Sequence, residues 1–75
     1  MKPEQCRMAR AALNWSTHKL AEAAGVGLNT INRYEKGGDA RMSSVEKIRA
    51  ALEAAGVQFI PENGGGPGVR MKSRS

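Results

Sequence analysis

The chain has 75 residues and a net charge of +5, because 12 lysines and arginines outnumber 7 aspartates and glutamates. This length fits one small domain, and no apolar run is long enough to cross a bilayer. The basic balance suits nucleic acid or an anionic membrane surface, whereas 3 aromatic residues are too few for a surface that stacks unpaired bases. A single cysteine excludes an internal disulfide and a thiolate metal cluster. The polar, basic start lacks the apolar run of a signal peptide, so we expect a cytoplasmic protein.

The first helix is expected to begin near Pro3, a residue type that suits the first turn of a helix. Cys6, Ala9 and Leu13 then recur at helical spacing and predict a buried stripe. A free cysteine in such a stripe is expected to be a small buried hydrophobe rather than a redox or ligand residue. Arg10 lies beside the stripe and needs either a protein partner or a phosphate.

The second helix is expected to start after Ser16, whose hydroxyl can accept a hydrogen bond from a free backbone donor of the first turn. Trp15 and Leu20 occupy the two positions of a hydrophobic staple, so Trp15 is expected to clamp the core rather than stack on a ligand. His18 falls in the exposed first turn, and the chain has no second histidine. A solvated or phosphate-facing imidazole is therefore expected rather than a metal ligand.

The stretch 17–36 predicts two short helices joined by a tight turn. Ala21 is small where two steeply crossing helices need their backbones close together, and Gly25 can adopt the left-handed conformation of a sharp helix end. The second of these helices is expected from about Leu28 to Lys36, with a stop at Gly37. Apolar residues at helical spacing are expected to be buried: Leu20, Ala24, Val26, Ile31 and Tyr34. This combination is a fairly specific helix-turn-helix signal.

A further helix is predicted after a connection over residues 39–42. Ser43 and Glu46 have the spacing of a capping box. The apolar stripe that follows is formed by Val45, Ile48, Leu52 and Ala55. Gly56 is expected to end this helix.

Beyond residue 56 the hydrophobic period changes from helical to alternating. Val57 to Ile60 is a short strand candidate stopped by Pro61, and Val69 to Lys72 is a second one. Between them lies a glycine-rich loop, which lacks the Gly-Lys-Ser/Thr continuation of a phosphate-binding loop. The two strands could form a hairpin whose free edge invites a second copy of the chain. The alternative is a frayed basic tail that ends in Lys72, Arg74 and Ser75.

The expected fold is an all-α core of four short helices that contains a helix-turn-helix, with a C-terminal strand or hairpin extension. Residues 1–56 would form the helix-turn-helix domain, and residues 57–75 the glycine-rich tail.

From about Cys6 to Val57 the chain resembles the phage-repressor and Cro-like helix-turn-helix family, also called the XRE family, with its lambda-repressor-like fold. The resemblance rests on a set of positions spread over all four helices: Arg10, Trp15, Ser16, Leu20, Ala21, Gly25, Val26, Thr30, Ile31, Arg33, Glu35, Gly37 and the helix from Ser43 to Leu52. It departs from the family at Thr17, where glutamine is frequent, and at Gly27, where serine or threonine is favoured. The strand-like tail also stands where the family has a fifth helix.

The resemblance implies that the helix near residues 28–36 enters the major groove of DNA. The residues implied at base edges are Leu28, Asn29, Asn32 and Arg33. Asn29 has the chemistry to pair with adenine and Arg33 with guanine, whereas Leu28 either meets a thymine methyl group or is an ordinary surface leucine. The residues implied at phosphates are Arg10, Thr17, Thr30, Lys36 and Arg41. The resemblance also implies an ion pair between Arg10 and Glu35.

The function expected is sequence-specific regulation of transcription by a homodimer on a pseudo-palindromic operator in double-stranded DNA. The alternative is a protein-interaction module, an antitoxin or antiactivator that binds a partner protein through the tail or the recognition-helix face. Interface anchors for either kind of association would be Val57, Phe59, Val69 and Met71, joined by Leu28 in the alternative. An enzyme is not expected, because one cysteine and one histidine leave neither a nucleophile–base pair nor a metal site. No cofactor is expected.

Overall fold

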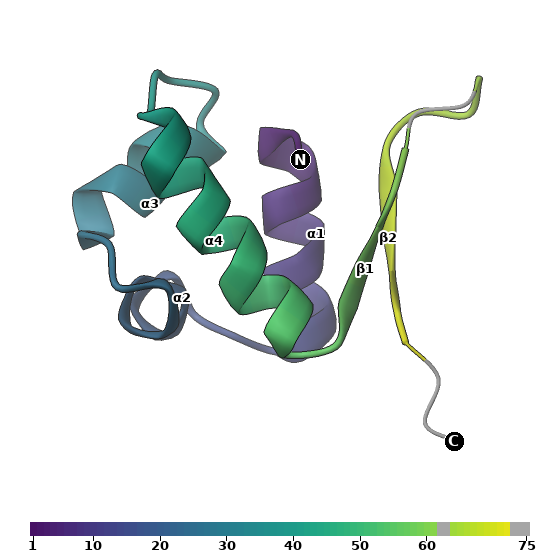
Figure 1. Ribbon diagram of the computed structural model, residues 1–75. Coiled ribbons are helices and arrows are strands. Elements are labelled where there is room, and N and C mark those ends of the chain that lie inside the picture. The colour runs from purple at the N-terminus through teal and green to yellow at the C-terminus, as the bar shows by residue number, and fades with distance from the viewer. Residues whose placement is uncertain (62–63, 73–75) are drawn as a thin grey trace.

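The computed structural model describes residues 1–61 and 64–72 and contains four helices followed by a β-hairpin (Figure 1). The elements are α1 (Pro3–Leu13), α2 (Thr17–Ala24), α3 (Leu28–Glu35), α4 (Met42–Ala54), β1 (Val57–Ile60) and β2 (Gly68–Met71). The predicted fold class is confirmed. Arg74 and Ser75, which the alternative assigned to a frayed basic tail, lie outside the described residues.

The first three helices end where the local sequence allows a left-handed residue. Asn14, Gly25 and Gly37 have φ angles of 57°, 70° and 87° and reverse the chain after α1, α2 and α3. At the start of α2, the hydroxyl oxygen of Ser16 accepts a hydrogen bond from the backbone nitrogen of Lys19 at 3.0 Å. The ends at Gly25 and Gly37 confirm the predicted stops, and the bond to Ser16 confirms the predicted N-cap.

The predicted capping box at Ser43 is wrong. Helix α4 begins at Met42 after the N-cap residue Arg41, and no side chain caps its first turn. The early start places Ser43 inside the first turn rather than before it. Smaller differences concern Lys36, which follows α3 as its C-cap, and β2, which begins one residue earlier than predicted.

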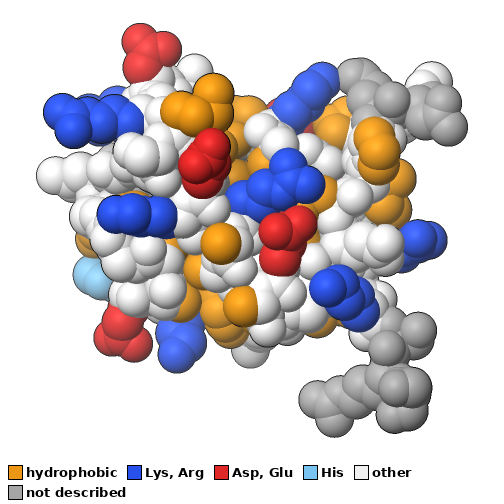
Figure 2. All heavy atoms as spheres, in the orientation of Figure 1, with side chains coloured by type: hydrophobic (Ala, Val, Ile, Leu, Met, Phe, Trp, Pro, Cys, Tyr) orange, Lys and Arg blue, Asp and Glu red, His pale blue; other side chains and the backbone are white. Residues whose placement is uncertain are grey.

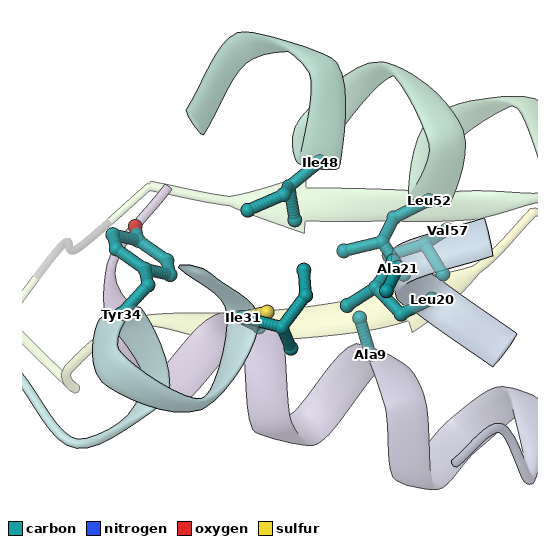
Figure 3. Packing of buried hydrophobic residues seen from close by; sticks show 9 residues of the cluster. Ala9, Leu20, Ala21, Ile31, Tyr34, Ile48, Leu52 and Val57 are labelled. Carbon is teal, nitrogen blue, oxygen red and sulfur yellow. The ribbon is translucent and has the colours of Figure 1, made fainter. Parts of the chain in front are cut away.

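One hydrophobic core joins all four helices to the first strand (Figure 3). It is formed by Cys6, Ala9, Leu20, Ala21, Ile31, Tyr34, Ile48, Leu52 and Val57. Ala24, Val26 and Val45 are only partly buried and pack around it. Trp15 also packs against this core, as the staple position predicted, with the ammonium of Lys19 5.7 Å from its ring centroid.

The hairpin packs against α1 and α4 on the side of the molecule away from α2 and α3 (Figure 1). Its strands are antiparallel, with Val57 opposite Met71 and Phe59 opposite Val69. Val57 is fully buried among helical residues, so the boundary expected after residue 56 does not separate two cores.

A glutamine of α1 holds the hairpin to the helices. The side-chain amide of Gln5 donates to the carbonyl oxygens of Ile60 and Gly68, at 3.0 and 2.9 Å, and so bridges both strands. Its Oε1 accepts from the backbone nitrogen of Lys2 at 2.8 Å. Because Gln5 is buried, these bonds satisfy polar groups that would otherwise be desolvated without a partner.

Candidate nucleic-acid interface

Helix α3 separates a buried face from an exposed one. Ile31, Tyr34 and Glu35 point into the protein. At 100° per residue, Asn29 and Arg33 fall on the opposite side of the helix, Asn32 lies toward its edge, and Leu28 lies next to the buried Glu35. Asn29 and Arg33 are exposed, whereas Leu28 and Asn32 are half-buried. Leu28 packs against the core, which leaves only part of its side chain at the surface.

Arginines from α3 and from the start of α4 converge beside this exposed face. Thr30, Arg33, Arg41 and Ser44 line one hollow. A neighbouring hollow is lined by Arg33, Asp39, Ala40 and Arg41. Within the part of the chain that the structure describes, the guanidinium groups of Arg33 and Arg41 have no hydrogen-bond or ion-pair partner. Two unpaired guanidinium groups and two hydroxyls in one hollow suit an oxyanion such as a phosphate.

A glycine contacts the stem of Arg33. A Cβ atom at Gly38 would lie 2.7 Å from Cγ of Arg33 and 3.0 Å from its carbonyl oxygen. The backbone nitrogen of Gly38 also donates to that carbonyl at 2.9 Å and closes the end of α3. The bare glycine therefore leaves room for Arg33 to leave the helix toward the hollow.

Arg10 is directed into the protein by Glu35. Its Nε and Nη2 donate to the two carboxylate oxygens at 2.6 and 2.7 Å, and its Nη1 donates to the carbonyl oxygen of Trp15 at 3.1 Å. The hydrogen bonds to Glu35 are the main cause of the raised pKa of the Arg10 guanidinium. All three guanidinium nitrogens therefore make hydrogen bonds inside the protein, and two of them bind Glu35.

Two further groups from α1 meet the same glutamate. The thiol of Cys6 donates to Oε2 of Glu35 at 3.3 Å, and the guanidinium of Arg7 donates to its backbone carbonyl oxygen. Burial, followed by the hydrogen bond to Glu35, raises the pKa of the Cys6 thiol to about 12. A protonated, fully buried thiol is chemically inert, as predicted for a core cysteine.

The remaining residues implied at phosphates lie at helix ends. Thr17 is the first residue of α2 and is half-buried, while Lys36 follows α3 and is exposed. Gly27 precedes α3 without a side-chain cap, so free backbone donors point out of its first turn. His18 is exposed.

Several interface anchors named from the sequence lie elsewhere. Val57 is part of the core and is not available at the surface, because the hairpin buries it against the helices. Phe59 and Val69 are half-buried, and only Met71 is exposed.

The sequence patterns did not indicate two residues of this site, Ser44 and Gly38. Ser44 follows Ser43, the predicted start of the capping box, and an earlier helix start would have placed it beside Arg41. Gly38 follows the stop predicted at Gly37, and no local pattern indicates its contact with Arg33.

In the described part of the chain, no group of three or more His, Cys, Asp or Glu residues could hold a metal ion. None of the helices in that part has the length and apolar character that a membrane span requires.

Comparison with known proteins gives two results. The profile of a helix-turn-helix family matches residues 7–60, which include all of α2, α3, α4 and β1. Two uncharacterised HTH-type transcriptional regulators, from Sinorhizobium medicae (strain WSM419) and Rhizobium meliloti (strain 1021), are each 32% identical over 73 residues. The match covers 92% of this chain and 52% of each relative, so the chain spans about half their length. The chain belongs to the Cro/C1-type, or XRE, helix-turn-helix family.

Proposed function

We propose that the chain is a sequence-specific DNA-binding regulator of transcription that acts as a homodimer on a pseudo-palindromic operator. The observation that carries the proposal is the exposed face of α3 beside the unpaired Arg33 and Arg41. Family membership and the names of the two relatives support it. The alternative of a protein-interaction module gains nothing from the hairpin, because Val57 is buried in the core.

The proposed contacts divide into two kinds. Leu28, Asn29 and Asn32 face base edges from the first turns of α3, where a side chain can reach the floor of the major groove. Thr17, Thr30, Lys36 and Arg41 lie along phosphates and set the register of the protein on the duplex. Arg33 borders both surfaces, because it leaves α3 toward the hollow that it shares with Arg41.

The test is selection of binding sites from random duplex DNA at moderate and then at raised salt. A two-fold symmetric motif is expected, and affinity should fall steeply with salt as phosphate contacts release counterions. Arg41→Ala should weaken binding to all sequences and reduce the salt slope by about one. Arg70→Ala removes the same charge from the hairpin, where Arg70 contacts Gln58 at 2.9 Å, and is expected to change neither quantity. Recovery of no motif would reject the proposal for the chain acting alone.

Arg33 receives its own test in the same experiment. Arg33→Ala should relax one position of each half-site if the guanidinium reads a base, with a discrimination loss of about 1–3 kcal/mol. A uniform loss over all sequences would instead place Arg33 with Arg41 at the phosphates.

A further inference from the structure

The start of α4 carries an apolar surface with no partner in the described chain. Met42 is 73% exposed, far more than Met8, Ile60 or Met71, which are 36–43% exposed. Beside it is a hollow, and the two together are called the Met42 surface. Its lining residues are Met1, Tyr34, Ala40, Met42, Val45, Glu46 and Arg49. Figure 2 looks onto the side of the molecule that carries α4 and shows hydrophobic side chains among acidic and basic ones.

We propose that a second copy of this chain docks on the Met42 surface around a two-fold axis. The proposal rests on the proposed function, which requires a dimer. A two-fold interface must be self-complementary, since the same patch meets itself. The Met42 surface meets this condition in shape, because it offers a projecting apolar side chain and an adjacent hollow with the apolar walls of Tyr34, Ala40 and Val45.

The charges on this surface are self-complementary as well. Glu46 and Arg49 both line the hollow, so a two-fold axis can bring Glu46 of each copy to Arg49 of the other. Among the described residues, the guanidinium of Arg49 pairs with the exposed Glu53, at 3.3 Å, and lies over the face of the Phe59 ring. An exposed pair within one helix contributes little to stability, so Arg49 can exchange it for a contact across the interface.

The hairpin is a poorer surface for a second copy. Val57 is in the core, and Phe59 and Val69 are half-buried within one chain. If two β2 strands pair in antiparallel register centred on Arg70, Arg70 lies opposite its own copy. If the register is centred on Met71, Arg70 lies opposite Lys72 of the other copy. In both registers like charges lie directly opposite each other, which destabilises a sheet. The same charges protect the free edge from self-association.

The Met42 surface also suits the spacing of an operator. Ala40 lines both this hollow and the hollow with Arg33 and Arg41, so the dimer interface would border the DNA-binding surface. Two copies of α3 would then lie near the two-fold axis, as half-sites about one helical turn apart require. A dimer through the hairpin would place the two copies of α3 on its outer sides, because α3 lies on the side of the protomer away from the hairpin. Each protomer measures 32 × 29 × 19 Å, so the two α3 helices would then be far apart.

The experiment is sedimentation equilibrium of the full chain, without DNA, over a range of concentrations. Met42→Glu is compared with Met71→Glu, which places the same charge at the exposed methionine of the hairpin. We expect the wild-type chain and Met71→Glu to dimerise with equal affinity, and Met42→Glu to dimerise about tenfold or more weakly. A carboxylate in the first turn of α4 is favourable for the helix, so circular dichroism should show an unchanged fold. A wild-type monomer at all concentrations, or loss of the dimer in Met71→Glu, would overturn the proposal.

Charge reversal provides an independent measurement. Glu46→Arg and Arg49→Glu should each weaken the dimer, and the double variant should recover most of the lost affinity. Failure of the double variant to recover would reject the proposed pairing across the two-fold axis. Because none of these measurements contains DNA, their failure is distinguishable from failure of the proposed DNA binding.

Discussion

Glu35 connects α3 to α1. Its carboxylate accepts two hydrogen bonds from Arg10 and one from Cys6, although its side chain is only 7% exposed. A buried carboxylate with this many donors is satisfied only while all of them stay in place. The cluster therefore fixes the orientation of α3 relative to α1, and with it the direction in which the exposed face of α3 points.

Removal of Arg10 should destabilise the domain strongly. Arg10→Ala leaves Glu35 buried without its charged partner, which is expected to cost about 3–5 kcal/mol of the free energy of unfolding. That is a large part of the roughly 5–15 kcal/mol typical of whole domains. The double variant Arg10→Met with Glu35→Leu removes both charges and should recover most of the loss. Urea denaturation of the three chains measures this, and a double variant no more stable than Arg10→Ala would contradict it.

At the scale of elements, the end of α3 combines two glycines with different functions. Gly37 has a φ of 87°, and a Cβ atom added there would meet nothing within 4 Å, so it provides only the left-handed turn. Gly38 has no such φ, but a side chain there would meet Arg33. The turn and the position of the arginine can therefore be tested separately.

Gly37→Ala and Gly38→Ala form a matched pair. Gly37→Ala should lower stability by about 1–2 kcal/mol, because an L-residue is strained in the left-handed region, and leave the DNA affinity of the folded protein unchanged. Gly38→Ala should displace Arg33 and weaken DNA binding, most clearly on the operator obtained by selection. Thermal unfolding and DNA titration of both variants give the two readouts. Equal DNA affinity for the two variants would show that Gly38 does not position Arg33.

The same elements show what the sequence can predict. The ends of α2 and α3 follow from Ser16, Gly25 and Gly37, since these signals act within a few residues. The start of α4 carries no capping side chain, so the nearby serines were a misleading local signal. The bonds of Gln5 to the hairpin span 55 and 63 residues, and no local pattern indicates them.

The candidate site likewise has one part that the local sequence predicts and one part that it does not. The exposed face of α3 follows from helical period alone. The hollow between Thr30 and Ser44 depends on how two helices pack, and only the three-dimensional structure brings its residues together.

At the scale of the whole molecule, helices and hairpin share one core, and Cys6 lies inside it. A thiol with no exposed surface can lose its proton to solvent only when the surrounding structure opens. The folded state holds the pKa of this thiol at about 12, compared with an ordinary value of 9.0. Between these two values the folded chain keeps the proton while the unfolded chain releases it.

Stability should therefore fall as the pH rises above about 9, because the unfolded state binds fewer protons than the folded state over that range. The contribution of Cys6 is fully present below its unfolded pKa and is lost as the pH approaches about 12. Urea denaturation between pH 7 and 11 measures this, with Cys6→Ala as the control. The pKa of Tyr34 is also raised, chiefly by burial, but both chains keep this tyrosine, so the difference between their slopes reports the thiol. Parallel pH dependence in the two chains would mean that the Cys6 proton is not held by the folded core.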